Sequence, residues 1–118
     1  MSEKITFPTE PNEEGFFFAS QEDLEAGILT KEYENGSKIK KLTLSTGKEA
    51  VIRMLKGRDF IETKKRLQAD NTADVETVGL SLATKIDDKQ QPTEYYLDDL
   101  YQNDYLKIFI AYSTLNLQ

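Results

Sequence analysis

The sequence contains no cysteine and no histidine. The missing thiols exclude disulfide bonds and cysteine chemistry throughout the chain. The missing imidazoles remove the side chain that most often serves as a general base near neutral pH and that most often binds transition metals. We therefore expect a protein that is not an enzyme and that holds no metal ion or cofactor.

Long apolar runs are also missing. No stretch of about 18 apolar residues is present, which argues against a helix that spans a membrane. Residues 1–15 include four glutamates and two prolines and have no apolar segment of the kind that a secretory signal needs. We expect residues 1–15 to form a flexible acidic arm and residues 16–118 to form a single domain of a cytoplasmic protein without a membrane partner.

The net charge of −6 is unevenly distributed along the chain. Residues 1–34 carry nine acidic and two basic side chains, residues 35–68 carry three and ten, and residues 69–118 carry nine and three. The basic middle segment could contact nucleic acid. We favour the alternative, in which the acidic flanks neutralise it within the fold or in a homo-oligomer, because the protein as a whole would repel phosphate.

The first half of the chain has the pattern of an antiparallel meander. Residues 28–34, 39–45 and 50–55 are strand-like segments separated by turn sequences. Asn35-Gly36 predicts a type I′ hairpin, in which both central residues have positive φ, and Thr46-Gly47 marks the second turn. Ser20 is placed to cap a short helix ahead of the first strand.

Three adjacent phenylalanines, Phe16, Phe17 and Phe18, precede this short helix. They cannot share one face of a strand, because successive side chains alternate between the two faces. We expect Phe16 and Phe18 to cover the core and Phe17 to pack under the arm. The alternative is that the aromatic rings form an exposed patch that binds a partner.

The second half has helical periodicity. Helices are predicted from Asp59 to the loop at residues 70–72, over residues 73–86, from Thr93 to Leu100 and from Asn103 to Leu117. Gly79 either weakens the second helix or lets another element approach closely. The stripes that we expect to face the core are Phe60, Ile61 and Leu67, then Val75, Val78, Leu82 and Ile86, and finally Tyr105, Ile108, Phe109, Tyr112 and Leu115.

The predicted fold class is therefore α+β, with an N-terminal three-stranded antiparallel meander followed by three to four packed helices. Asp59 and Asp104 fall in the first turns of predicted helices, where a carboxylate stabilises free backbone amides, and we expect both to be structural caps. A carboxylate metal site of Asp98, Asp99 and Asp104 is an alternative, although adjacent carboxylates point apart and lack the spacing of a calcium loop.

A set of short motifs runs through residues 39–118 in a fixed order. The motifs are Leu42-Thr43-Leu44 at the end of a strand, Gly47 in a turn, Val51-Ile52-Arg53 in a strand, Gly57-Arg58-Asp59 at the start of a helix, and Leu97, Leu100, Asp104 and Tyr105 leading into the closing helix. In order and spacing they resemble the phage tail assembly chaperone family of Mu-like and related tailed phages.

The resemblance implies a non-enzymatic assembly factor that binds the tape-measure protein in the bacterial host cell while the tail tube forms around it. The tail tube protein is a second candidate partner, and the alternative function is a structural tail or baseplate component that stays in the virion. Aromatic side chains are common at protein interfaces. The candidate partner-binding residues are Phe17, Tyr105, Phe109 and Tyr112.

Overall fold

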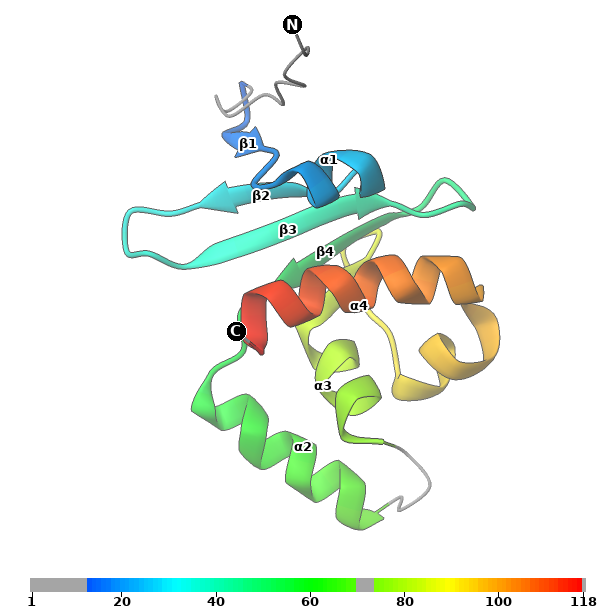
Figure 1. The fold of residues 1–118 in the computed structure, drawn as a ribbon. Coiled ribbons are helices and arrows are strands. Elements are labelled where there is room, and N and C mark those ends of the chain that lie inside the picture. The colour runs from blue at the N-terminus through cyan, green and yellow to red at the C-terminus, as the bar shows by residue number, and fades with distance from the viewer. Residues whose placement is uncertain (1–12, 70–73, 118) are drawn as a thin grey trace, which may run out of the picture.

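The computed structural model describes residues 13–69 and 74–117, which form an α+β fold with helices packed on a six-stranded antiparallel sheet (Figure 1). The strands are β1 (Phe16–Phe17), β2 (Leu29–Glu32), β3 (Lys38–Thr43), β4 (Glu49–Arg53), β5 (Thr84–Ile86) and β6 (Lys89–Gln90). The helices are α1 (Gln21–Ala26), α2 (Gly57–Ala69), α3 (Val75–Ala83), the π-helical turn η1 (Tyr95–Asp99) and α4 (Gln102–Asn116).

Each strand pairs with the next one in sequence, so the sheet is a meander from β1 to β6. The predicted α+β class is confirmed, and the predicted three-stranded meander corresponds to β2, β3 and β4. The sheet is wider than predicted because β1, β5 and β6 extend it on both sides. These three strands have only two or three residues each, too few to show a period in the sequence.

The β2–β3 hairpin lies where Asn35-Gly36 predicts it, but the turn type differs. Tyr33 N donates to Ser37 O at 2.8 Å and Gly36 N donates to Tyr33 O at 2.9 Å, which closes a three-residue loop. Gly36 is left-handed with φ of 89°, whereas Asn35 does not have a positive φ. The prediction of a type I′ turn was therefore wrong, and the same three-residue geometry recurs around Gly47 in the β3–β4 hairpin.

A tight turn of the predicted kind joins β5 and β6 instead. Asp87 and Asp88 both have positive φ, at 49° and 69°, which is the conformation that a two-residue hairpin requires. Asp87 Oδ1 also accepts a hydrogen bond from Glu49 N at 2.9 Å. Asp87 and Asp88 thus close the last hairpin, and Asp87 ties it to β4.

One face of the sheet carries the core. Cross-strand partners share a face, and one row on the inner face consists of Thr30, Lys40, Ile52 and Thr84. Leu42, Ala50 and Ile86 form the next row. Helix α4 lies across β3 and β4 on this face, and α3 packs between α4 and α2 (Figure 1). The buried cluster consists of Ile28, Leu42, Leu44, Ala50, Ile52, Leu80, Ala83, Ile86, Tyr96, Ile108, Ala111 and Tyr112.

Helix α3 ends earlier than predicted. The helix was expected to continue to Ile86, but it stops at Ala83 and the chain becomes β5. Thr84 and Ile86 are buried while Lys85 is exposed, which is the alternation of a strand. The β-branched residues Thr84 and Ile86 pair with β4, whose free edge offers backbone hydrogen bonds that a longer helix would leave unused.

Helix α2 begins at Gly57, two residues before the predicted start at Asp59, and it buries a different side. Thr63 is buried against the body of the protein, whereas Phe60 is 63% and Ile61 51% exposed. The expected stripe of Phe60, Ile61 and Leu67 therefore faces largely outward, with only Leu67 half-buried. The side of α2 that packs against the protein is polar, so hydrophobic spacing alone could not distinguish it from a side that faces solvent. The loop predicted at residues 70–72 lies outside the described residues.

The aromatic triplet also differs in detail from the prediction. Phe16 pairs with Lys31 and lies on the outer face of the sheet, with Lys41 Nζ 4.1 Å from its ring centroid. Phe17 pairs with Thr30 and so lies on the inner face. Phe16 is therefore buried, as expected, but on the outer face and not over the core beneath the helices. Most of the arm under which Phe17 was expected to pack lies outside the described residues.

Helix caps follow the sequence in one case and not in the other. Ser20 Oγ accepts from Asp23 N at 3.0 Å and caps α1, as predicted. The next short helix was predicted to start at Thr93, where a threonine could cap it, but the Thr93 hydroxyl lies 3.2 Å from Ser81 Oγ and the helix is the π-turn η1. A hydroxyl that reaches a tertiary partner is lost as a local cap.

Gly79 allows α3 and α4 to approach each other closely. A Cβ atom at this position would clash with the hydroxyl of Tyr112 and would lie 3.8 Å from Leu55 Cδ1. Of the two roles predicted for Gly79, the close approach of another element is therefore confirmed.

Gly79→Ala should lower the free energy of unfolding by about 1–3 kcal/mol, because the added methyl group overpacks the α3–α4 contact. The double variant Gly79→Ala/Tyr112→Phe should recover most of this loss, since the clashing hydroxyl is gone. Urea unfolding of the four proteins in the cycle measures the coupling. If Gly79→Ala lowered the free energy of unfolding equally with Tyr112 and with Phe at position 112, the close approach of Gly79 to the Tyr112 hydroxyl would be contradicted.

Candidate functional site

The motif residues at the β4–α2 junction are joined by an ion pair. Arg53 Nη1 and Nη2 donate to Asp59 Oδ2 and Oδ1 at 3.0 and 2.9 Å, the two-pronged geometry that arginine and carboxylate favour. Asp59 Oδ2 also accepts from Lys56 N at 2.8 Å, which satisfies the amide just before α2. The hydrogen bond from Arg53 is the main reason that the pKa of Asp59 falls to about 2. Asp59 is a structural cap, as predicted.

Asp104 joins the start of α4 to the sheet. Its side chain lies in the first turn of α4, as expected, and the residue is 1% exposed. Its Oδ1 accepts from Ser45 N at 3.0 Å and its Oδ2 accepts from Ser45 Oγ at 2.6 Å, so it caps the β3–β4 turn instead of its own helix. The carboxylates of both motifs are therefore used to hold elements of the fold together.

The alternative metal site does not assemble. Asp98 and Asp99 are exposed on η1, while Asp104 is buried against Ser45. Within residues 13–69 and 74–117, no group of three or more acidic side chains could hold a metal ion.

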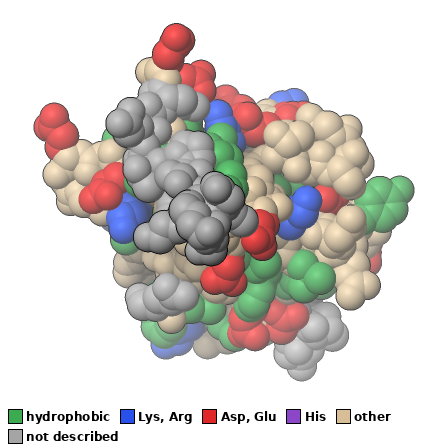
Figure 2. Space-filling view, turned by 45° about the horizontal axis from the view of Figure 1, so that its top comes forward, with side chains coloured by type: hydrophobic (Ala, Val, Ile, Leu, Met, Phe, Trp, Pro, Cys, Tyr) green, Lys and Arg blue, Asp and Glu red, His purple; other side chains and the backbone are tan. Residues whose placement is uncertain are grey.

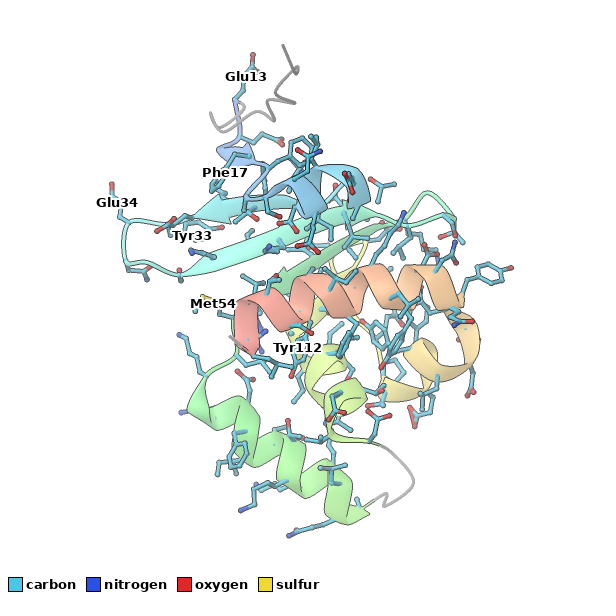
Figure 3. The ribbon with its side chains drawn as sticks, in the orientation of Figure 1. Glu13, Phe17, Tyr33, Glu34, Met54 and Tyr112 are labelled. Carbon is cyan, nitrogen blue, oxygen red and sulfur yellow. The ribbon has the colours of Figure 1, made fainter. Side chains whose placement is uncertain are left out.

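Three of the four candidate partner-binding residues pack inward from α4. Tyr112 is 6% exposed and points from α4 toward α3 (Figure 3). The hydroxyl of Tyr105 lies 2.7 Å from Thr77 Oγ1, and its ring stacks on Phe109 with centroids 6.5 Å apart. Tyr105 and Phe109 are partly buried against the core. These residues contribute to helix packing, and only the outer edges of Tyr105 and Phe109 can reach a partner.

Phe17, the fourth candidate, lies away from this group, beside β2 (Figure 3). It is half-buried and lines a pocket of about 330 Å³ with Thr114 and Leu115 near the C-terminal end of α4. The structure therefore does not bring Phe17 together with Tyr105 and Tyr112.

The same pocket contains a buried ion pair that the sequence did not reveal. Lys40 Nζ lies 2.7 Å from Asp23 Oδ2, and the two residues are 5% and 2% exposed. Thr30 Oγ1, also in the wall, has no hydrogen-bond partner among the described residues. The alternation that places Leu42 on the core face also places Lys40 there, and this was the signal that could have identified it.

An apolar stripe on the outer side of α4 is the surface best suited to a partner. Leu106, Ile110 and Leu117 are 50%, 43% and 58% exposed. Leu106 and Ile110 are four residues apart and so lie on one side of α4, opposite the buried Ile108, and Leu117 is the cap residue just after the helix ends. Sequence reasoning missed this stripe because α4 is apolar on two sides and the stripe with the aromatic residues dominates its periodicity.

Charge is scarce along this helix. Between Tyr105 and Gln118 the sequence has one charged residue, Lys107, whereas 31% of the whole chain is charged. Depletion of charge with retention of large apolar side chains is typical of the central part of protein interfaces. We therefore take Leu106, Ile110 and Leu117, which we call the outer stripe of α4, as the candidate binding surface.

No helix in the described parts of the chain has the length and apolar character that crossing a membrane requires. No protein-family model, curated protein or solved structure matches this chain.

Lys40→Met should lower the free energy of unfolding by about 3–5 kcal/mol, because it leaves the carboxylate of Asp23 buried without its cation. Replacing both partners, as in Asp23→Leu/Lys40→Met, should recover most of the loss. Urea unfolding measures both losses. Arg66→Ala is the control, because the side chains of Arg66 and Glu62 are partly exposed, at 37% and 46%, and their ion pair should contribute less than about 1 kcal/mol. Equal losses from Lys40→Met and Arg66→Ala would contradict this account.

Stability should depend on Asp59 at acid pH. The pKa of this group is about 2 in the folded state, below its ordinary value of 3.8, so its contribution is present above about pH 4 and disappears as pH falls toward 2. At about 1.4 kcal/mol per pKa unit, the loss is at most about 2.5 kcal/mol. Urea unfolding between pH 6 and pH 2.5 should show a steeper decline for the wild type than for Asp59→Asn; parallel curves would contradict the role of Asp59.

Proposed function

We propose that this protein is a phage or prophage tail assembly chaperone, a non-enzymatic factor that binds the tape-measure protein in the cytoplasm of the host cell. The observation that carries the proposal is the outer stripe of α4. It presents exposed apolar side chains along a helix almost without charge. Such a surface suits an extended helical partner better than a small-molecule substrate.

The spacing of the stripe supports a helix as the bound element. Leu106 and Ile110 lie one turn apart on α4 and Leu117 follows directly after its last residue, so a partner helix with an apolar stripe of its own can lie along them. The partly exposed edge of Phe109 borders the stripe and would add aromatic area. A tape-measure protein, which is long and partly helical, offers such stripes repeatedly.

The resemblance to the chaperone family gains support from the roles of its motif residues. Asp59 and Asp104 position α2 and α4 relative to the sheet, so the motifs specify an architecture instead of a catalytic centre. The absence of histidine and cysteine from the sequence agrees with a function that involves no catalysis.

The size of the stripe suits reversible binding. Full burial of one large apolar side chain contributes about 1.5–3 kcal/mol, and these three are already about half-buried. Each contact would therefore be weak, and firm coating of a long partner would depend on many copies bound side by side. Weak individual contacts also allow tail tube subunits to displace the chaperone as the tube grows.

Leu106→Asp/Ile110→Asp should abolish capture of the tape-measure protein, because two carboxylates would have to lose their water on binding. Tagged protein would be purified from cells that express the surrounding gene cluster, and bound proteins would be identified by mass spectrometry. The wild type should enrich one long, helix-rich tail protein, and the variant should recover at least about tenfold less, the equivalent of 1.4 kcal/mol.

Val75→Asp is the matched control, because Val75 is 50% exposed at the start of α3, away from the stripe. It should capture the partner as the wild type does. If Leu106→Asp/Ile110→Asp captured as much partner as the wild type does, the proposed binding surface would be wrong. Retention of the chain in purified virions together with tail proteins would instead support the alternative of a structural tail or baseplate component.

A further inference from the structure

Helix α2 exposes a surface that is both basic and apolar. Phe60 and Ile61 are 63% and 51% exposed, and Arg58, Lys64 and Lys65 are exposed around them. Lys64 Nζ lies 5.7 Å from the ring centroid of Phe60. We call these five residues the basic face of α2. Large apolar side chains ringed by charges of one sign are typical of a binding surface rather than of a solvated helix.

The described part of the acidic N-terminal segment forms ion pairs with two lysines of β3 but with no residue of this helix. Lys40 pairs with Asp23 at 2.7 Å, and Lys41 pairs with Glu14 at 3.4 Å. These acids belong to the end of the molecule that carries α1 and β1. Figure 2 shows acidic side chains scattered over this face among apolar and a few basic ones. Helix α2 lies at the other end (Figure 1).

The acids of α2 itself are also occupied. Asp59 pairs with Arg53 at 2.9 Å and Glu62 pairs with Arg66 at 3.1 Å. Arg58, Lys64 and Lys65 form no ion pair with any residue of 13–69 or 74–117. The basic face of α2 therefore has three positive charges left for another molecule.

A second surface has the opposite charge and a similar combination of exposed apolar and charged side chains. Leu97 and Tyr101 are 52% and 65% exposed around η1, and Glu94, Asp98 and Asp99 are exposed beside them. The sequence has no basic residue from Gln90 to Leu106, and these three acids form no ion pair within the described parts of the chain. We call these five residues the acidic turn.

The two surfaces cannot meet within one molecule. In Figure 1, α3 separates α2 from the segment between β6 and α4 that contains η1. Each surface has two large exposed apolar side chains and three like charges, and the charges of the two surfaces are opposite. Opposite charges with matched apolar centres are the arrangement that favours specific association.

We propose that the basic face of α2 in one copy of this protein binds the acidic turn of a second copy. The contact places Phe60 and Ile61 against Leu97 and Tyr101, inside a ring of three oppositely charged pairs. Because the charges lie at the surface, association weakens as salt screens them. This inference does not depend on the proposed function, since it involves no other protein.

Charge reversal tests the contact by sedimentation velocity of the full-length chain, from about 10 µM to 1 mM in low salt. The wild type should form dimers or longer assemblies. Lys64→Glu/Lys65→Glu and Asp98→Lys/Asp99→Lys should each weaken association at least about tenfold. An equimolar mixture of the two variants should associate again, because each then offers the charge that the other lacks.

The control is Lys85→Glu/Lys89→Glu, which changes the net charge equally at exposed positions on β5 and β6. It should associate as the wild type does. If a reversed variant loses its folded circular dichroism signal, Arg58→Glu and Glu94→Lys replace it on the respective surface. A monomeric wild type at 1 mM, an equal effect of the control, or failure of the mixture to associate would overturn the proposal and leave the basic face of α2 to a different anionic partner.

Discussion

The buried contact between Asp104 and Ser45 determines how the helical layer sits on the sheet. A carboxylate that is 1% exposed must have strong hydrogen bonds, and both oxygens of Asp104 find them at the β3–β4 turn. Breaking this contact would leave a charge in the interior. The start of α4 is therefore fixed over β3 and β4, and α3 fills the space that remains between α4 and α2.

This arrangement leaves apolar surface unused on two helices. Helix α3 is buried from Thr77 to Ala83, so it takes up the inner sides of both of its neighbours. The outer stripe of α4 and the basic face of α2 then remain in solvent, although both helices have enough apolar residues to be covered. The domain thus buries most of α3 while α2 and α4 keep large apolar side chains in solvent, a pattern typical of surfaces that bind other molecules.

Local features were predicted well from the sequence where the chemistry is local. The Ser20 cap, the hairpin at Gly36, the cap at Asp59 and the inward stripe of α4 all depend on residues close in sequence. The end of α3, the face of α2 and the position of Phe17 were not predicted. Each of these depends on which distant strand or helix the segment meets, and hydrophobic spacing does not report that.

The sequence by itself determined the α+β class, the antiparallel hairpins and the absence of histidine and cysteine chemistry, because composition and short-range turn geometry are sufficient for these. The tertiary structure decided that Lys40 and Asp23 meet in the interior, that Tyr112 packs against Gly79, and that Leu106 and Phe60 face outward. Burial is a property of contacts between segments far apart in the chain, so it was settled only when the helices packed on the sheet.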